Sequence, residues 1–323
     1  MPIASHTDPV LRPWPSYSES VLRTVLLSLS ESRAIRHWME TSPTADRLTS
    51  RFVAGRSIEH EMEVIKRLKS ENTLATVDYL GENVTSLAEA AKTRDTYLAI
   101  LERVAGLNVG ATVSIKPSQF GLSISKDVCR DNINPLVSRA RELGTRVEID
   151  MESSEYVDQT LEIVSAMHAL HGSVRAVIQA YLYRSEKDVE CLFAEKIPIR
   201  LCKGAYKEPP SAAFQKKVEV DRNYVRLTNM ILERGAYPAV ATHDEKMVAE
   251  ALGTVKKRGI TPDRFEFQML YGIRRDLQQR IVEEGYRLRL YVPYGDAWYP
   301  YFMRRLAERP ANVMFLARNF FRS

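Results

Sequence analysis

The chain has 323 residues, of which 45% are apolar and 27% are charged, a composition typical of soluble globular proteins. This length allows one large domain or two smaller ones. The net charge of +5 fits an anionic ligand or a membrane surface, but the basic residues are not clustered as in nucleic-acid-binding tails, so we expect no nucleic-acid partner.

The cysteines and the apolar runs limit the classes of protein further. Three cysteines, without metal-ligand spacing, argue against a disulfide framework and against a metal site, and they favour a reducing compartment. No run approaches the roughly 18–20 continuous apolar residues that a membrane-spanning helix needs. The opening stretch MPIASHTDPVLRPWP lacks a basic region followed by an apolar core, so it predicts a flexible lead-in and no secretory signal.

The first part of the chain has the periodicity of helices. Apolar residues recur at helical spacing from Leu22 to Leu29 and again from Ile58 to Leu68. We therefore predict that residues 17–70 are helical throughout and that residues 1–71 form an N-terminal helical segment packed on the domain that follows.

From residue 73 onward, short apolar or alternating runs take turns with amphipathic stretches. Helical patterns occupy residues such as 86–104, 156–170 and 245–258. Eight strands, each followed by a helix, predict an α/β fold, a (β/α)8 TIM-type barrel, over residues 72–323. No glycine-rich dinucleotide fingerprint follows any strand. The strand-like runs are 73–80, 111–117, 146–151, 175–181, 197–203, 237–243, 264–270 and 286–292.

Polar residues alternate with apolar ones along these strands, as in EID (148–150) and YRLRLY (286–291). Alternate residues of a strand face opposite sides, so the apolar set would pack on the outer helices and the polar set, including Arg287, would point into the barrel. Barrel enzymes keep their chemistry at the C-terminal ends of the strands. Polar residues at or near such ends are Lys116, Asp150, Gln179, Arg200, Lys203, His243 and Tyr291. Singly, each has a structural interpretation, but seven on one rim favour an active site.

Two adjacent arginines, Arg304 and Arg305, fall on what reads as the last helix. Neighbouring residues of a helix point about 100° apart, so these two cannot both follow one solvated stripe. They form either a surface charge pair or a fork of donors for one carboxylate or phosphate. The two residues alone leave both interpretations open.

The strand-end motifs resemble those of the proline dehydrogenase family, flavin-dependent barrel enzymes that oxidise L-proline to Δ1-pyrroline-5-carboxylate. The resemblance runs from VDYLGE (77–82) to NVMFLAR (312–318). It includes SIKPS (114–118), EIDMES (148–153), VIQAYL (177–182), RLCKGAY (200–206), ATHDEK (241–246), FQMLYG (267–272), LYVPYGD (290–296) and YFMRRLAE (301–308). It implies FAD as cofactor and L-proline as substrate.

The resemblance also implies a substrate site. Lys116 looks like the family's barrel lysine, and Arg304 with Arg305 like the paired arginines that clamp the proline carboxylate. Glu82 resembles the acid that pairs with an arginine of this fork to close the site. The lining positions of the pocket are matched by Leu270, Ala205, Tyr206, Tyr291 and Tyr301.

For the flavin, Arg200 resembles the family's arginine near N5, where negative charge develops as hydride arrives, and Asp150 resembles the acid that holds this cationic cluster. Positions around the rest of the cofactor are matched by Met151, Gln179, Cys202, Lys203, Gly204, Ala205, Thr242, His243 and Glu308. Two positions depart from the family pattern: SIKPS lacks a leucine before its second serine, and Cys202 replaces a small apolar residue, so we expect a backbone contact there and no redox thiol.

Two other functions compete with this interpretation. A Schiff-base aldolase would use Lys116 or Lys203 as a desolvated nucleophile. A non-enzymatic basic barrel would bind membranes or polyanions through outward-facing cations. The resemblance further implies electron transfer to a ubiquinone-type acceptor, and the basic, aromatic segment FLARNFFRS (315–323) favours peripheral contact with an anionic inner membrane. The predicted location is therefore the cytoplasm, or the matrix side if the source has mitochondria.

Overall fold

The computed structural model describes residues 36, 37, 39, 49–81 and 84–307. The chain separates into two compact units. The larger unit, Ser50–Trp298, contains the barrel. The smaller one combines Met1–Thr49 with Tyr299–Ser323. This grouping differs from the expected boundary after residue 71, which stays a prediction.

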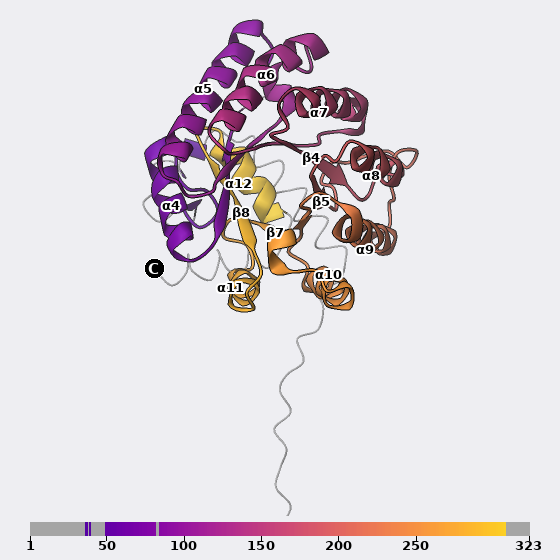
Figure 1. Ribbon diagram of the computed structural model, residues 1–323. Coiled ribbons are helices and arrows are strands. Elements are labelled where there is room, and N and C mark those ends of the chain that lie inside the picture. The colour runs from indigo at the N-terminus through magenta and orange to yellow at the C-terminus, as the bar shows by residue number, and fades with distance from the viewer. Residues whose placement is uncertain (1–35, 38, 40–48, 82–83, 308–323) are drawn as a thin grey trace, which may run out of the picture. The chain divides into compact units, whose positions relative to one another are not determined.

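Eight parallel strands close into a barrel in the order of the chain, from β1 to β8, with β8 paired to β1. This arrangement confirms the predicted (β/α)8 fold (Figure 1). The strands are β1 (Leu74–Tyr79), β2 (Thr112–Ile115), β3 (Val147–Ile149), β4 (Val174–Gln179), β5 (Ile199–Cys202), β6 (Ala239–Ala241), β7 (Glu266–Leu270) and β8 (Leu288–Tyr294).

A helix follows each strand, and within residues 50–73 one helix precedes the first strand. The helices are α4 (Ile58–Ser70), α5 (Leu87–Gly106), α6 (Lys126–Glu142), α7 (Val157–His171), α8 (Ser185–Ala194), α9 (Lys217–Arg234), α10 (Glu245–Arg258), α11 (Arg275–Glu283) and α12 (Trp298–Ala307). Several begin at residues suited to cap free amide groups: Ser86 and Glu89 form a capping box on α5, and Asp244 caps α10.

The apolar positions of the strands face the helices, as predicted. Val77 of β1, Val113 of β2 and Ile149 of β3 are fully buried in one core cluster with Ile100 and Leu101 of α5. This packing accounts for the alternation in the sequence, because only one parity of each strand contacts the helices.

The opposite parity fills the inside of the barrel with paired charges. The guanidinium of Arg175 is fully buried and lies 3.0 Å from Glu148 and 2.6 Å from Glu266. Arg289 donates to Glu266 at 2.9 Å, and Arg200 lies 3.0 Å from the other oxygen of Glu148. Buried charges are stable only when paired, so this network replaces an apolar core at this level of the barrel.

Two local predictions were wrong. Residues 51–57 form turns and bends, not helix: Ala54 donates its amide to the Pro293 carbonyl at 2.9 Å, and Gly55 accepts from the Gly295 amide at 3.0 Å, so this segment bonds to the end of β8. Arg287 does not point into the barrel. It precedes β8, is exposed, and donates to the Tyr237 hydroxyl at 3.2 Å. The predicted helix over residues 17–35 lies outside the described residues.

Candidate active site

Four of the predicted residues meet at the C-terminal mouth of the barrel. Lys116 and Asp150 directly follow β2 and β3, while Arg200 and Tyr291 lie on β5 and β8. The Lys116 ammonium donates to the Tyr291 hydroxyl at 3.2 Å, and that hydroxyl donates to Asp150 Oδ2 at 3.0 Å. Arg200 forms an ion pair with Asp150 Oδ1. The four side chains therefore form one continuous polar cluster, drawn from opposite sides of the barrel.

Electrostatics keep this cluster charged. Burial alone lowers the pKa of Arg200, but the carboxylates of Asp150 and Glu148 outweigh it, so the pKa lies above its usual range. Burial, together with the negative charge of Asp150, raises the pKa of Tyr291 well above its usual range. Arg200 is therefore a fixed cation and Tyr291 a neutral hydroxyl group at any physiological pH.

The partner of Lys116 was missed in the sequence. Asp78 of β1 accepts from the Lys116 ammonium at 2.7 Å, and its side chain is 1% exposed. Burial raises the pKa of Asp78, and Lys116 offsets only part of this effect. The sequence does contain a signal for this position, because Thr76 and Asp78 have the same inward parity in β1 that identified Lys116 and Asp150 in their strands.

A second carboxylate fixes the turn that follows Lys116. Glu152 accepts from the Ser118 amide at 2.7 Å and from the Ser118 hydroxyl at 2.6 Å. Pro117 begins a 3-10 helix, Pro117–Phe120, at this point. Pairing across neighbouring strand ends thus holds SIKPS against EIDMES, although SIKPS departs from the family pattern.

The ends of β4 and β5 provide a surface of backbone and amide groups. Gln179 donates to the Met151 carbonyl at 3.1 Å, while its buried Oε1 atom has no hydrogen-bond partner among the described residues. Gly204 has a φ of +112°, and a Cβ atom there would lie 2.3 Å from the ring of Tyr181. Only glycine fits this turn. Cys202 donates weakly to the Ile178 carbonyl at 3.6 Å.

Burial raises the pKa of the Cys202 thiol to about 11, so the thiol stays protonated. The neighbouring Lys203 is held between two acids, 2.5 Å from Asp221 and 2.9 Å from Asp244. Its charge is therefore already balanced by the protein.

The ends of β6 and β7 are joined through His243, whose Nε2 atom accepts from the Leu270 amide at 2.8 Å. Thr242 accepts from the Asp244 amide at 3.1 Å and so shapes the start of α10. Ala205 and Tyr206 are exposed in the segment that follows β5. His243 therefore has a structural contact at this rim in addition to any role in binding.

Five further predicted residues are Glu82, Tyr301, Arg304, Arg305 and Glu308. Glu82, Glu308 and the side chain of Arg304 lie outside the described residues. Tyr301 and Arg305 belong to the smaller compact unit, in which the Arg305 guanidinium lies 5.2 Å from the centre of the Tyr301 ring. The arginine fork stays a prediction.

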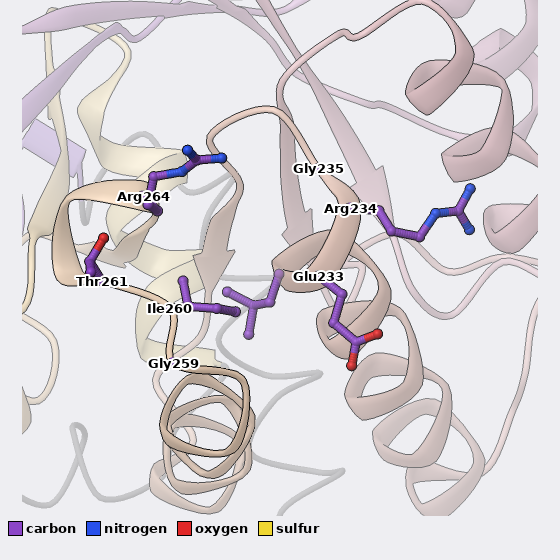
Figure 2. Close-up of a pocket in the computed structure, with 8 residues that line it drawn as sticks. Glu233, Arg234, Gly235, Gly259, Ile260, Thr261 and Arg264 are labelled. Carbon is purple, nitrogen blue, oxygen red and sulfur yellow. The ribbon is translucent and has the colours of Figure 1, made fainter.

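A pocket of about 350 Å³ lies away from this mouth, where α9 and α10 end (Figure 2). Its lining includes the apolar side chains of Leu232 and Ile260, and Figure 2 shows Arg264 at one side. Arg234 is engaged by Glu190 at 2.6 Å. This pocket contains none of the residues predicted from the sequence, and the helix C-termini at its edge present carbonyl groups, which do not suit an anion.

The chain is similar to one family model, Proline dehydrogenase, over residues 62–318. It is 40% identical to Proline dehydrogenase 2 of Bacillus subtilis over 265 residues, which cover 82% of this chain and 88% of that protein. It is 38% identical to Proline dehydrogenase 1 of the same organism over 299 residues, 92% of this chain and 98% of the relative. The proline dehydrogenase of Deinococcus radiodurans is 40% identical over 276 residues, 84% of this chain and 89% of the relative.

Solved structures show the same fold within longer chains. Proline utilization A of Bdellovibrio bacteriovorus, inactivated by N-propargylglycine, superposes with a TM-score of 0.79 at 25% identity, over 90% of this chain and 37% of that one. The Bradyrhizobium japonicum protein gives a TM-score of 0.70 at 24% identity, over 82% of this chain and 31% of that one. The chain thus spans about a third of the length of these proteins.

Proposed function

Because the chain belongs to the proline dehydrogenase family, we propose that it oxidises L-proline to Δ1-pyrroline-5-carboxylate with FAD as hydride acceptor. The observation that carries the proposal is the polar cluster of Lys116, Asp150, Arg200 and Tyr291 at the barrel mouth. It combines fixed cations with a neutral hydroxyl group, which suits a small zwitterion.

The substrate carboxylate would be bound by Lys116. The Lys116 side chain is 29% exposed, so it is only partly buried. An ammonium has three donors, and the structure uses two of them, toward Asp78 and Tyr291. The third has no hydrogen-bond partner in the part of the chain that the structure describes, so it remains for a ligand. We propose that Arg304 and Arg305 supply further donors and that Glu82, Leu270, Ala205, Tyr206 and Tyr301 complete the pocket around the ring.

Residues at the ends of β4 and β5 suit a bound flavin. The unpartnered Oε1 atom of Gln179 can accept a hydrogen bond from the cofactor, and the turn at Gly204 lets a ligand approach the backbone. FAD, when bound, supplies the acceptor for the hydride that leaves proline. Arg200 would stabilise the negative charge that results, while Asp150 holds Arg200 in place.

Further cofactor contacts are proposed from the matched motifs, at Met151, Cys202, Lys203, Ala205, Thr242, His243 and Glu308. At Lys203, cofactor binding would require a local rearrangement, since the ammonium is already paired with Asp221 and Asp244. Either acid must yield part of that pairing for Lys203 to bind a phosphate group.

The aldolase alternative is disfavoured by the charge of its proposed nucleophile. A Schiff-base lysine needs a lowered pKa. Burial lowers the pKa of Lys116, but Asp78 and Asp150 outweigh burial, so the pKa is raised. Lys203 is engaged by two carboxylates. The alternative of a basic surface binder is disfavoured because the charges on the inward strand positions are paired inside the barrel.

For the electron acceptor, we propose a membrane quinone reached by reversible peripheral contact, in the cytoplasm or on the matrix side of the inner membrane. Among the described residues, no helix is long and apolar enough to cross a bilayer. The net charge of +5 supports attraction to an anionic surface. Turnover with a short-chain ubiquinone analogue tests the acceptor, and vesicle binding that weakens with salt tests the contact. No turnover with any quinone would contradict the first claim.

The reaction itself is tested by product analysis. Purified protein should convert L-proline to Δ1-pyrroline-5-carboxylate, detected by mass spectrometry, and Arg200→Met should lower turnover at least 100-fold. Arg226→Met is a matched control, since Arg226 pairs with Glu186 on the outer surface. A lysine adduct trapped by borohydride with a carbonyl substrate, with no product from L-proline, would support the aldolase instead.

A further inference from the structure

Asp78 contacts the polar cluster at the barrel mouth, but none of the residue roles predicted from the sequence includes it. It lies on β1, with the carboxylate directed to the Lys116 ammonium at 2.7 Å, and it is almost completely buried. We propose that Asp78 is a positioning residue, which holds the Lys116 ammonium in the orientation that leaves one donor free for the carboxylate of a substrate. The binding half of this inference rests on the proposed function.

The two carboxylates at the barrel mouth, Asp78 and Asp150, bind different cations. Asp150 Oδ1 accepts from Ser114 at 2.8 Å and pairs with Arg200, and Oδ2 accepts from Tyr291 at 3.0 Å. Asp150 Oδ2 is 4.0 Å from the Lys116 ammonium, beyond hydrogen-bond distance. Asp150 therefore holds Arg200, and Asp78 holds Lys116.

The geometry at Lys116 explains why this division matters. Asp78 and the Tyr291 hydroxyl receive two of the three ammonium donors, at 2.7 and 3.2 Å, and thereby fix the direction of the third. Without Asp78, the nearest carboxylate for Lys116 among the described residues would be Asp150. A shift toward Asp150 would redirect the free donor and disturb the pair with Arg200.

Among the described residues, Lys116 is the cation that pairs with Asp78. Its Oδ2 atom is buried without a hydrogen-bond partner in the part of the chain that the structure describes. Losing Lys116 would leave a buried carboxylate without its cation, which is costly. Separating Asp78 from Lys116 would thus cost more free energy than separating a surface ion pair. A bound substrate therefore contacts the Lys116 ammonium while Asp78 stays paired with it.

The test measures the reactivity of Lys116 without requiring catalysis. Full-length protein is treated with trace acetic anhydride across a range of pH, and acetylation of each lysine is followed by mass spectrometry. In the wild type, Lys116 should react more slowly than surface lysines at neutral pH. In Asp78→Asn, which keeps the shape and an acceptor but removes the charge, Lys116 should react at least about 10-fold faster, because loss of the counter-charge makes the neutral amine more abundant.

The matched control is Asp158→Asn, which removes an exposed acid paired with Arg184 at 2.6 Å on the outer surface. It should leave the Lys116 rate unchanged. Unchanged Lys116 reactivity in Asp78→Asn would overturn the inference. If that variant does not fold, wild-type Lys116 reacting as fast as surface lysines would overturn it equally.

Steady-state kinetics separate this inference from the proposed function. The KM for L-proline should rise about 10-fold or more in Asp78→Asn, with a smaller change in kcat, because the free donor of Lys116 is no longer directed. A changed Lys116 rate with an unchanged KM would overturn the role in binding. If no variant, nor the wild type, oxidises L-proline, the proposed function fails while the acetylation result still decides the pairing of Lys116 with Asp78.

Discussion

Replacing Gly204 by alanine should damage both stability and flavin retention. The backbone at Gly204 has a φ of +112°, and the added Cβ would lie 2.3 Å from a carbon of the Tyr181 ring. The backbone strain costs about 1–3 kcal/mol. The clash adds about 1–3 kcal/mol, since Tyr181 is buried and cannot swing away freely. We therefore expect a loss of about 2–6 kcal/mol, a large part of the 5–15 kcal/mol typical of a domain.

Urea denaturation and the ratio of flavin to protein after purification provide the two readouts. The matched control is Gly253→Ala in the interior of α10, where the new methyl group would meet no atom within 4 Å apart from its chain neighbours and the nearby backbone of the helix itself. This variant should gain about 0.5–1 kcal/mol from helix propensity and keep its flavin. A Gly204→Ala protein as stable and as yellow as the wild type would refute the reasoning about this turn.

Three other predictions follow from buried or adjacent charges. Burial raises the pKa of Glu61 well above its ordinary value of 4.5, so the contribution of Glu61 to stability is present below pH 4.5 and is lost as pH rises through the folded pKa. The variant Glu61→Gln should therefore be about 1–3 kcal/mol more stable than the wild type at pH 8 but little different at pH 4. Parallel curves of stability against pH for the two proteins would contradict this. Arg175→Met should lose about 3–5 kcal/mol in urea denaturation, whereas Arg226→Met in an exposed pair should lose less than about 1 kcal/mol; equal losses would show that burial of the network is unimportant. Arg304→Met and Arg305→Met should each raise the KM for L-proline by the equivalent of roughly 2–5 kcal/mol, and unchanged KM values in both would favour the surface pair.

The barrel was predictable because its pattern repeats along the chain. Strands such as β3 alternate between an apolar parity, as at Val147 and Ile149, and a polar parity, as at Glu148, and the structure buries both. The strand ends then indicated where Lys116, Asp150, Arg200 and Tyr291 would meet, since parallel strands in a barrel end on one face.

Other features depend on contacts that periodicity does not encode. The segment before α4 has apolar residues, but it bonds to Pro293 and Gly295 at the end of β8, so tertiary contacts override its helical pattern. The pairing of Lys203 with Asp221 and Asp244 joins positions from three segments, and no spacing rule predicts it. The alternation along β1 could have predicted that Asp78 points into the barrel. That Asp78 pairs with Lys116 and not with Arg200 follows from the geometry of the closed barrel.

The most direct test of the account is the visible spectrum of the purified protein during anaerobic addition of L-proline. We expect a yellow protein with flavin absorbance that L-proline bleaches, with one Δ1-pyrroline-5-carboxylate formed for each flavin reduced. Asp158→Asn should behave as the wild type, since Asp158 lies on the outer surface. A well-folded protein that retains no flavin, or one whose flavin stays oxidised in saturating L-proline, would contradict the central claim.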